Sequence, residues 1–138
     1  MENMTTESEG NDLDYPSFST VYLFWEKAQE EFKSKDIIEQ KDGCEKAYRA
    51  TTEAVDILLA NNGFFVPIGK PEAHLKRAEY LVALADINSR VKKIDAMYSL
   101  FKDKLHGMAF YSSLDPRKFK SIFVQVEDFI KEIRELVE

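Results

Sequence analysis

In residues 119–137, apolar residues recur every three or four positions without a break. This spacing places them on one side of an α-helix. Asp115 and Pro116 come shortly before the segment, and they suit the capping position and the first turn of a helix. An unbroken apolar side is stable only when it is buried against other elements. The segment therefore predicts a long helix that packs along its whole length.

Four earlier segments show the same spacing, in residues 18–32, 44–59, 75–85 and 91–108. No segment alternates polar and apolar residues in the manner of a β-strand. Five amphipathic helices joined by short connections favour an antiparallel up-and-down bundle, so we predict an all-α fold.

The helix boundaries can be predicted from capping residues. Ser17 is the expected N-cap of the first helix, and Gly63 is suited to close the second. Two starts fit the second helix: Asp36 can cap it early, with Gly43 inside, or Asp42 and Gly43 can form a turn. We favour the earlier start.

The chain has 138 residues and a formal net charge of -6 at pH 7, which fits one domain with a single core. Residues 1–15 hold five Asp and Glu and no Lys or Arg, and the first dozen contain almost no apolar residues. Too little surface can be buried there to offset the entropy lost when a backbone is ordered. We therefore predict a disordered acidic tail over residues 1–15 and one helical domain over residues 16–138.

The sequence also indicates in which cellular compartment the protein is found. No apolar run approaches the length of a membrane span, about 18 residues, and the first residues lack the basic and apolar regions of a signal peptide. Cys44 is the only cysteine, so no internal disulfide can form. These features predict a cytoplasmic protein with no membrane partner.

A stripe of polar residues runs beside the apolar stripe of the fourth helix, which we expect to end near residues 111–113. This stripe follows the same three-and-four spacing. Together with Tyr111, which lies beyond its end, the stripe forms our candidate ligand-binding site: Lys92, Ser99, Lys102, His106 and Tyr111. His106 is also the candidate for acid–base catalysis. The alternative is a solvated helix flank whose histidine is satisfied by hydrogen bonds.

Metal and covalent chemistry have little support. Asp103 and His106 are three residues apart, as in carboxylate–histidine metal motifs, but such sites need a second pair, and His74 has no carboxylate three positions away. Cys44 lies on an apolar seam, where burial disfavours the thiolate. The five glycines form no phosphate-binding loop. We predict no metal and no cofactor.

The charge is unevenly distributed. Residues 85–120 contain eight Lys and Arg against four Asp, a local net charge of +4 in an acidic protein. These bases flank His106, so the phosphate of a nucleotide or of RNA would meet a favourable field. The alternative is ordinary solubilising lysines at helix ends.

The connection over residues 63–70 is apolar, whereas most connections are polar. Its candidate interface residues are Phe64, Phe65, Val66 and Ile68. They can fold back over one end of the bundle or be buried against a second copy of the chain. Ten Phe, six Tyr and one Trp are many for so small a bundle, so we predict a homodimer.

The order of the helices and two short stretches resemble the HEPN superfamily. The first stretch covers residues 45–60, and the second is Leu-His-x-x-x-Phe-Tyr, from Leu105 to Tyr111. The second is most similar to the small stand-alone PaREP-like archaeal branch. The resemblance implies an up-and-down bundle, commonly dimeric. It also implies an RNase, an RNA-binding component of a toxin–antitoxin or defence system, or a nucleotide-binding partner of a nucleotidyltransferase.

Active ribonucleases of that superfamily carry an Arg followed after four to six residues by the catalytic His. The positions before His106 at that spacing hold Ser99, Leu100 and Phe101. We therefore expect a non-catalytic HEPN-like module that binds a nucleotide or RNA, rather than an enzyme. Two alternatives are a weak, unorthodox ribonuclease in which His106 acts with Lys102 or Lys104, and a purely structural protein partner.

Overall fold

A computed structural model describes residues 15–108 and 115–138 of the chain. In these two stretches the protein has five α-helices, one π-helical segment and no β-strand. They are α2 (Phe18–Phe32), α3 (Ile37–Asn61), α4 (Ala73–Ile87), α5 (Ser89–Phe101), η1 (Lys102–Met108) and α7 (Pro116–Val137). The prediction of an all-α bundle is confirmed. The predicted acidic tail lies, except for Tyr15, outside the described residues.

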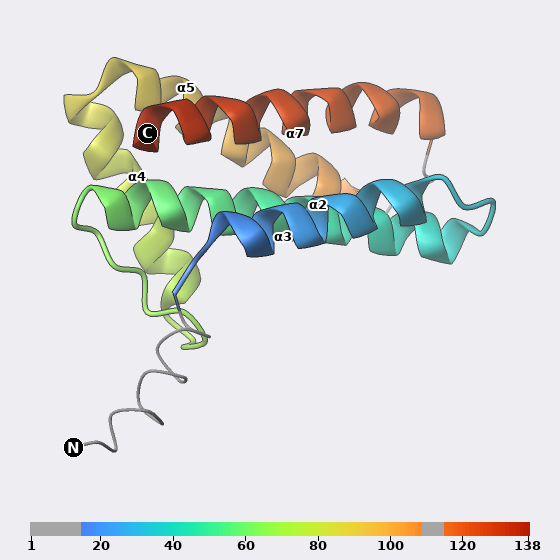
Figure 1. The fold of residues 1–138 in the computed structure, drawn as a ribbon, viewed down its shortest axis with the longest axis horizontal. Helices are drawn as coiled ribbons and strands as arrows, with labels where there is room; N and C mark the ends of the chain where they lie inside the picture. The colour runs from blue at the N-terminus through green and yellow to red at the C-terminus, as the bar shows by residue number, and fades with distance from the viewer. Residues whose placement is uncertain (1–14, 109–114) are drawn as a thin grey trace.

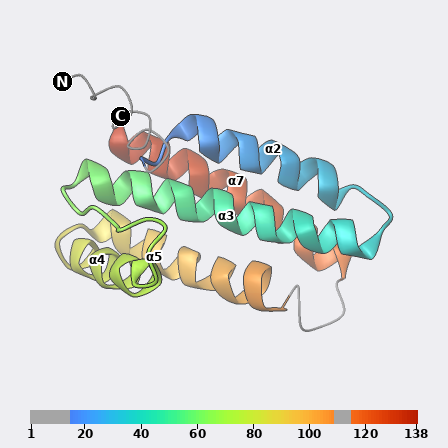
Figure 2. The same ribbon diagram turned by 90° about the horizontal axis from the view of Figure 1, so that it is seen from below.

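Helix α3 is the centre of the bundle, since it contacts α2, α4, α5, η1 and α7. Figure 1 shows α2, α3, α5 and α7 running in alternating directions. Helix α4 runs across the others instead, and Figure 2 shows it almost along its axis. Figure 2 also shows α3 between two groups, with α2 and α7 on one side and α4 and α5 on the other.

Short polar side chains begin four of the helices. Each accepts a hydrogen bond of 3.0 to 3.2 Å from a backbone N–H two or three residues later: Ser17, Asp36, Asn88 and Asp115. Asp36 is thus the start of α3, which confirms the earlier of the two predicted starts. Gly63 follows α3 with a φ of 87°, the left-handed conformation that closes helices and that glycine adopts without strain.

Gly43, inside α3, allows α2 and α3 to approach closely. A Cβ atom at this position would lie 2.8 Å from the Ala28 carbonyl oxygen and 2.9 Å from the Phe32 nitrogen, both backbone atoms of α2. Real Cβ atoms do not come so close to backbone atoms, so only glycine fits this crossing point.

The core lies between α3, α5 and α7, with α2 along one side. Phe101 of α5 is fully buried and meets Phe129 of α7 edge to face, with ring centroids 5.1 Å apart. Trp25 of α2 lies 5.5 Å from Phe123 of α7, measured between ring centroids. These aromatic pairs join helices that are far apart in the sequence.

The prediction of one buried apolar side for residues 75–85 is wrong at three positions, Leu75, Ala78 and Val82, which are exposed. Leu75 and Val82 are 62% and 52% exposed, whereas Arg77, Leu81 and Leu84 are buried. Helix α4 crosses its neighbours rather than lying along them, so it contacts them over a short stretch and not along a full stripe.

The prediction of one continuous α-helix from residue 91 to about residues 111–113 is wrong at Lys102, where α5 changes into η1. A π-helix bonds each residue to the fifth along the chain instead of the fourth, so its turns are wider. The predicted helix end lies outside the described residues.

Among the helices that the structure describes, none combines the length and the apolar character needed to cross a bilayer.

Candidate functional site

A cleft of about 440 Å³ opens between α3, α4, η1 and the loop that joins α3 to α4. We call it the α3–α4 cleft. Its lining in the described part of the chain consists of Phe24, Glu45, Tyr48, Arg49, Thr52, Glu53, Asp56, Ile68, Gly69, Lys70, Ala73, His74, Arg77 and His106. Both histidines of the chain therefore line one cleft, although they lie on different elements.

Helix α3 supplies one polar wall of the cleft. Six of its residues, spaced by three and four positions, share one side of the helix: Glu45, Tyr48, Arg49, Thr52, Glu53 and Asp56. The neighbouring side is the buried apolar stripe. The spacing of these six residues is as visible in the sequence as that of the polar stripe predicted on the fourth helix, so the same signal could have indicated this wall.

His106 is held by a carboxylate from α3. Its Nδ1 atom lies 2.9 Å from Oε1 of Glu45, and its ring stacks on Tyr48 with centroids 5.1 Å apart. The His106 side chain is 52% exposed. When a neutral imidazole donates Nδ1–H to a carboxylate, its lone pair lies on Nε2, the tautomer suited to accept a proton.

The π-helical segment explains how His106 reaches Tyr48. Tyr98 and His106 are eight positions apart, and an uninterrupted α-helix would point them about 80° apart. Both rings nevertheless lie against Tyr48, since the Tyr48–Tyr98 centroid distance is 5.7 Å. The wider turn of η1 brings His106 back to the side of Tyr98.

A chain of hydroxyl groups fixes the tyrosine beneath His106. Tyr98 Oη lies 3.1 Å from Tyr48 Oη and 2.8 Å from Thr52 Oγ1, and Thr52 Oγ1 donates to the Tyr48 carbonyl oxygen at 3.1 Å. Because a hydroxyl has one hydrogen, Tyr98 donates to Thr52 and Tyr48 donates to Tyr98. Burial raises the pKa of Tyr98 well above its usual value, which keeps it a donor.

A buried ion pair joins α3 to α4 in the cleft wall. Arg77 donates from Nε and Nη2 to the two carboxylate oxygens of Asp56, at 2.7 and 3.0 Å. Burial raises the pKa of Asp56, and Arg77 partly opposes this rise. Burial lowers the pKa of Arg77, but the hydrogen bonds and the charge of Asp56 raise it above its ordinary value. The guanidinium therefore stays charged.

Three further cationic or basic side chains line the cleft. The Arg49 guanidinium lies 5.0 Å above the Phe24 ring centroid, and Lys70 and His74 are exposed.

The cleft lining also includes the carboxylate of Glu53, which accepts a hydrogen bond of 2.9 Å from the Ser17 backbone N–H. Burial raises the pKa of this carboxyl group, with a smaller opposing effect from that hydrogen bond.

The structure brings one residue of the predicted ligand stripe into the cleft. His106 lines it, whereas Lys92, Ser99 and Lys102 are exposed outside its described lining. Tyr111 lies outside the described residues. The predicted stripe assumed an uninterrupted α-helix, and the change to η1 alters the direction of His106.

The predicted basic patch is divided over several surfaces. Arg90 is engaged with Glu132 and Glu135 on α7, at 3.1 and 3.6 Å. Arg117 and Lys120 line a groove between α2 and α7. The cations that line the cleft come instead from α3, α4 and the loop between them.

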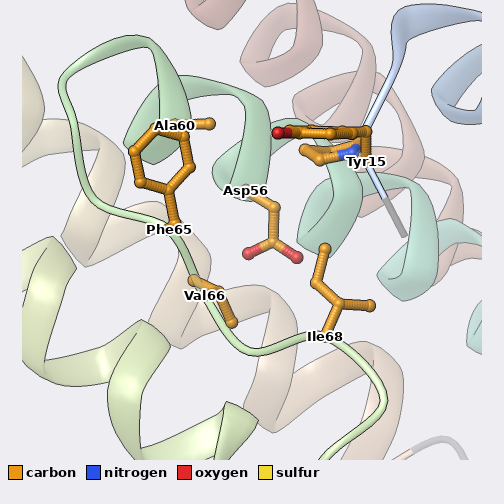
Figure 3. Close-up of a pocket in the computed structure, with 7 residues that line it drawn as sticks. Tyr15, Asp56, Ala60, Phe65, Val66 and Ile68 are labelled. Carbon is orange, nitrogen blue, oxygen red and sulfur yellow. The ribbon is translucent and has the colours of Figure 1, made fainter. Parts of the chain in front are cut away.

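The apolar connection after α3 folds back against the bundle. The Phe64 ring lies 5.3 Å from that of Tyr80, measured between centroids. An adjoining pocket of about 250 Å³ shares Asp56 and Ile68 with the cleft and is also lined by Phe65 and Val66. Figure 3 shows these side chains around the Asp56 carboxylate. Of the four predicted interface residues, Phe65 is 62% exposed and the others are partly buried.

The possible metal ligands and the single thiol, Cys44, have the following surroundings. Within residues 15–108 and 115–138, no three His, Cys, Asp or Glu side chains gather in a way that could hold a metal ion. Cys44 is fully buried, and burial raises the pKa of its thiol to about 12. A thiol in this environment stays protonated and is a poor nucleophile.

No family model, no curated protein and no solved structure matches this chain.

Proposed function

We propose that the α3–α4 cleft binds a nucleotide or a short stretch of single-stranded RNA through its phosphates, and that the chain is a cytoplasmic binding module. The observation that carries the proposal is the convergence of Arg49, Lys70, His74, Arg77 and His106 on one cleft. Arginine and lysine are the common ligands of phosphate, and histidine adds a donor and a ring.

The pairing of charges in the cleft supports an anionic ligand. Glu45 is engaged with His106, and Asp56 with Arg77. Arg49 and Lys70 form no ion pair with any residue in the described stretches. Glu53, the third carboxylate of the described lining, accepts a hydrogen bond from the Ser17 backbone N–H and forms no ion pair with either cation. A phosphate would give Arg49 and Lys70 a charged partner.

The cleft could also hold the nucleobase of the ligand beside its phosphate. The His106 ring is half-exposed and is supported from beneath by the buried Tyr48 ring. Unstacked bases bind to such rings by stacking, and the contact tolerates different bases. The resemblance to the HEPN superfamily, whose members include RNA-binding proteins and nucleotide-binding partners of nucleotidyltransferases, agrees with this ligand class.

The test is a binding titration with a nucleoside triphosphate and with a fluorescently labelled short single-stranded RNA. Arg49→Ala combined with Lys70→Ala should weaken binding by about tenfold or more, because two charge-assisted hydrogen bonds are lost. Lys92→Ala combined with Lys102→Ala removes the same charge outside the cleft and is the matched control. We expect it to change binding by less than about threefold at moderate salt.

Two results would contradict the proposal: no saturable binding of either ligand, or an equal loss in the cleft and control variants. Raising salt from about 50 to about 200 mM should weaken phosphate-driven binding in the wild type, and less so in the variant that lacks Arg49 and Lys70.

A ribonuclease is the second candidate, because the Glu45 carboxylate lies 2.9 Å from Nδ1 of His106. A carboxylate in this position orients an imidazole for general base catalysis. Arg49 lines the same cleft, so it is better placed than Lys102 to contact a phosphate. Incubation with labelled RNA tests this function: turnover lost in His106→Ala and reduced in Glu45→Gln supports it, and turnover that survives both rejects it.

The proposal includes a homodimer. Four large apolar side chains on α4 and the loop before it are more than half exposed: Phe65, Leu75, Val82 and Ile87. Exposed apolar surface is often covered in an oligomer. Sedimentation equilibrium should show a dimer that Leu75→Glu combined with Val82→Glu converts to monomers, and a wild-type monomer would reject this part.

A further inference from the structure

A second cavity, of about 470 Å³, lies between α2 and α7. We call it the α2–α7 groove. Figure 2 shows these two helices on the side of α3 away from α4, so the groove is separate from the α3–α4 cleft. Its size is typical of small-molecule sites.

The floor of the groove is aromatic. The Phe32 and Phe123 rings stack with centroids 4.4 Å apart, and Trp25 lies 5.5 Å from Phe123. Val124 also lines the groove and is 60% exposed, although most large apolar side chains of α7 are buried. Trp25 and Phe123 are already buried beneath the groove, so the apolar surface that a ligand would remove from water lies mainly at Val124 and the partly buried Phe32.

Positive charge gathers at one end of the groove. Lys33 follows the last residue of α2, and Arg117 and Lys120 lie in the first turns of α7. Figure 1 shows these two helix ends at the same end of the bundle. None of the three cations forms an ion pair with a residue that the structure describes.

The opposite end carries Glu127, the one carboxylate of the described lining, which forms an ion pair with Lys131 at 3.2 Å. It lies ten residues after Arg117, which corresponds to about 15 Å along an α-helix. The groove thus has at one end three cations without an ion pair among the described residues, an apolar floor, and at the other end a carboxylate that is already paired with Lys131. A ligand with one anionic group and an unbranched apolar tail therefore matches its charges best with the anionic group at the cationic end.

We infer that the α2–α7 groove binds a medium-chain fatty acid, with the carboxylate at Lys33, Arg117 and Lys120 and the alkyl chain over Phe123 and Val124. A second copy of this chain is a poorer occupant. In a two-fold contact each groove would meet an identical surface, and that surface carries three cations against one carboxylate.

Trp25 provides the test, because it is the only tryptophan and lines the groove. The full chain is titrated with octanoate, decanoate and dodecanoate below their micelle concentrations, and the tryptophan emission is recorded. We expect one site per chain, with affinity that rises about fourfold for each added methylene, as its burial predicts.

Ligand controls test the polarity of the groove. Dodecyltrimethylammonium has a chain of the same length and the opposite charge, and dodecanedioate places a second carboxylate near Glu127. Both should bind about tenfold or more weakly than dodecanoate. Equal binding of all three would overturn the inference, since it would show adsorption to apolar surface alone.

Two charge-reversal variants form a matched pair. Lys120→Glu changes the groove, whereas Lys118→Glu makes the same change at an exposed position of α7 outside its described lining. We expect a loss of about tenfold or more for Lys120→Glu and little change for Lys118→Glu. Circular dichroism confirms that both fold. Equal affinities would overturn the inference. So would a wild-type dimer that Lys120→Glu, but not Lys118→Glu, converts to monomers in sedimentation equilibrium.

Discussion

Arg77 of α4 donates two parallel hydrogen bonds to the Asp56 carboxylate of α3, and both side chains are almost fully buried, with 7% and 4% exposed. Asp56 lines both the α3–α4 cleft and the pocket of Figure 3. The pair therefore fixes the position of α4, the helix that carries His74 and Arg77 into the cleft.

Removal of one partner of this pair should be strongly destabilising. Asp56→Asn leaves the buried guanidinium without a compensating charge, and we expect the free energy of unfolding to fall by about 3 to 5 kcal/mol. Replacement of both partners by apolar residues, Asp56→Leu with Arg77→Met, should cost less than the single change. Urea denaturation measures both values. A larger loss in the double variant would contradict this reasoning.

Gly43→Ala should also destabilise the protein, although alanine is the better helix former by about 0.5 to 1 kcal/mol. The new Cβ would meet the Ala28 carbonyl oxygen at 2.8 Å, and forced overpacking costs about 1 to 3 kcal/mol. Gly107→Ala is the control, because its Cβ would meet Lys102 at an ordinary 3.8 Å. Thermal unfolding should show a lower midpoint for Gly43→Ala than for Gly107→Ala.

Tyr98→Phe removes the hydroxyl that links Tyr48 to Thr52, and we expect a loss of about 1 kcal/mol in the free energy of unfolding. The Tyr48 ring should also become less firmly placed under His106. Tyr80→Phe is the control, because no residue in the described stretches hydrogen-bonds to the Tyr80 hydroxyl. Equal losses in the two variants would reject a role for the network.

Cys44 should make stability fall at alkaline pH. Burial raises the pKa of its thiol from 9.0 to about 12, so between these values the native state keeps a proton that the unfolded state has lost. This contribution is complete below about pH 8 and decreases as pH rises through the window, by up to about 1.4 kcal/mol per unit. Urea denaturation at several pH values should show a shallower decline for Cys44→Ala than for the wild type.

The helices were predictable because their signals are local. Residues three and four positions apart share one side of a helix, and capping side chains such as Ser17 and Asp36 bond to backbone N–H groups within three residues. The change from α5 to η1 at Lys102 was not predictable in this way. It occurs where the chain packs against α3, and the stacking of His106 on Tyr48 is a contact between segments far apart in the sequence.

The amino-acid sequence by itself determined the all-α class, the starts of α2, α3 and α7, and the place of His106 beside a buried position. Only the tertiary structure decided what His106 faces. Glu45 is 61 residues away from it in the chain, and Asp56 is 21 residues from Arg77. Helix spacing specifies which residues share a side, but the angle at which two helices cross decides which sides meet, and that angle depends on the packing of the whole core.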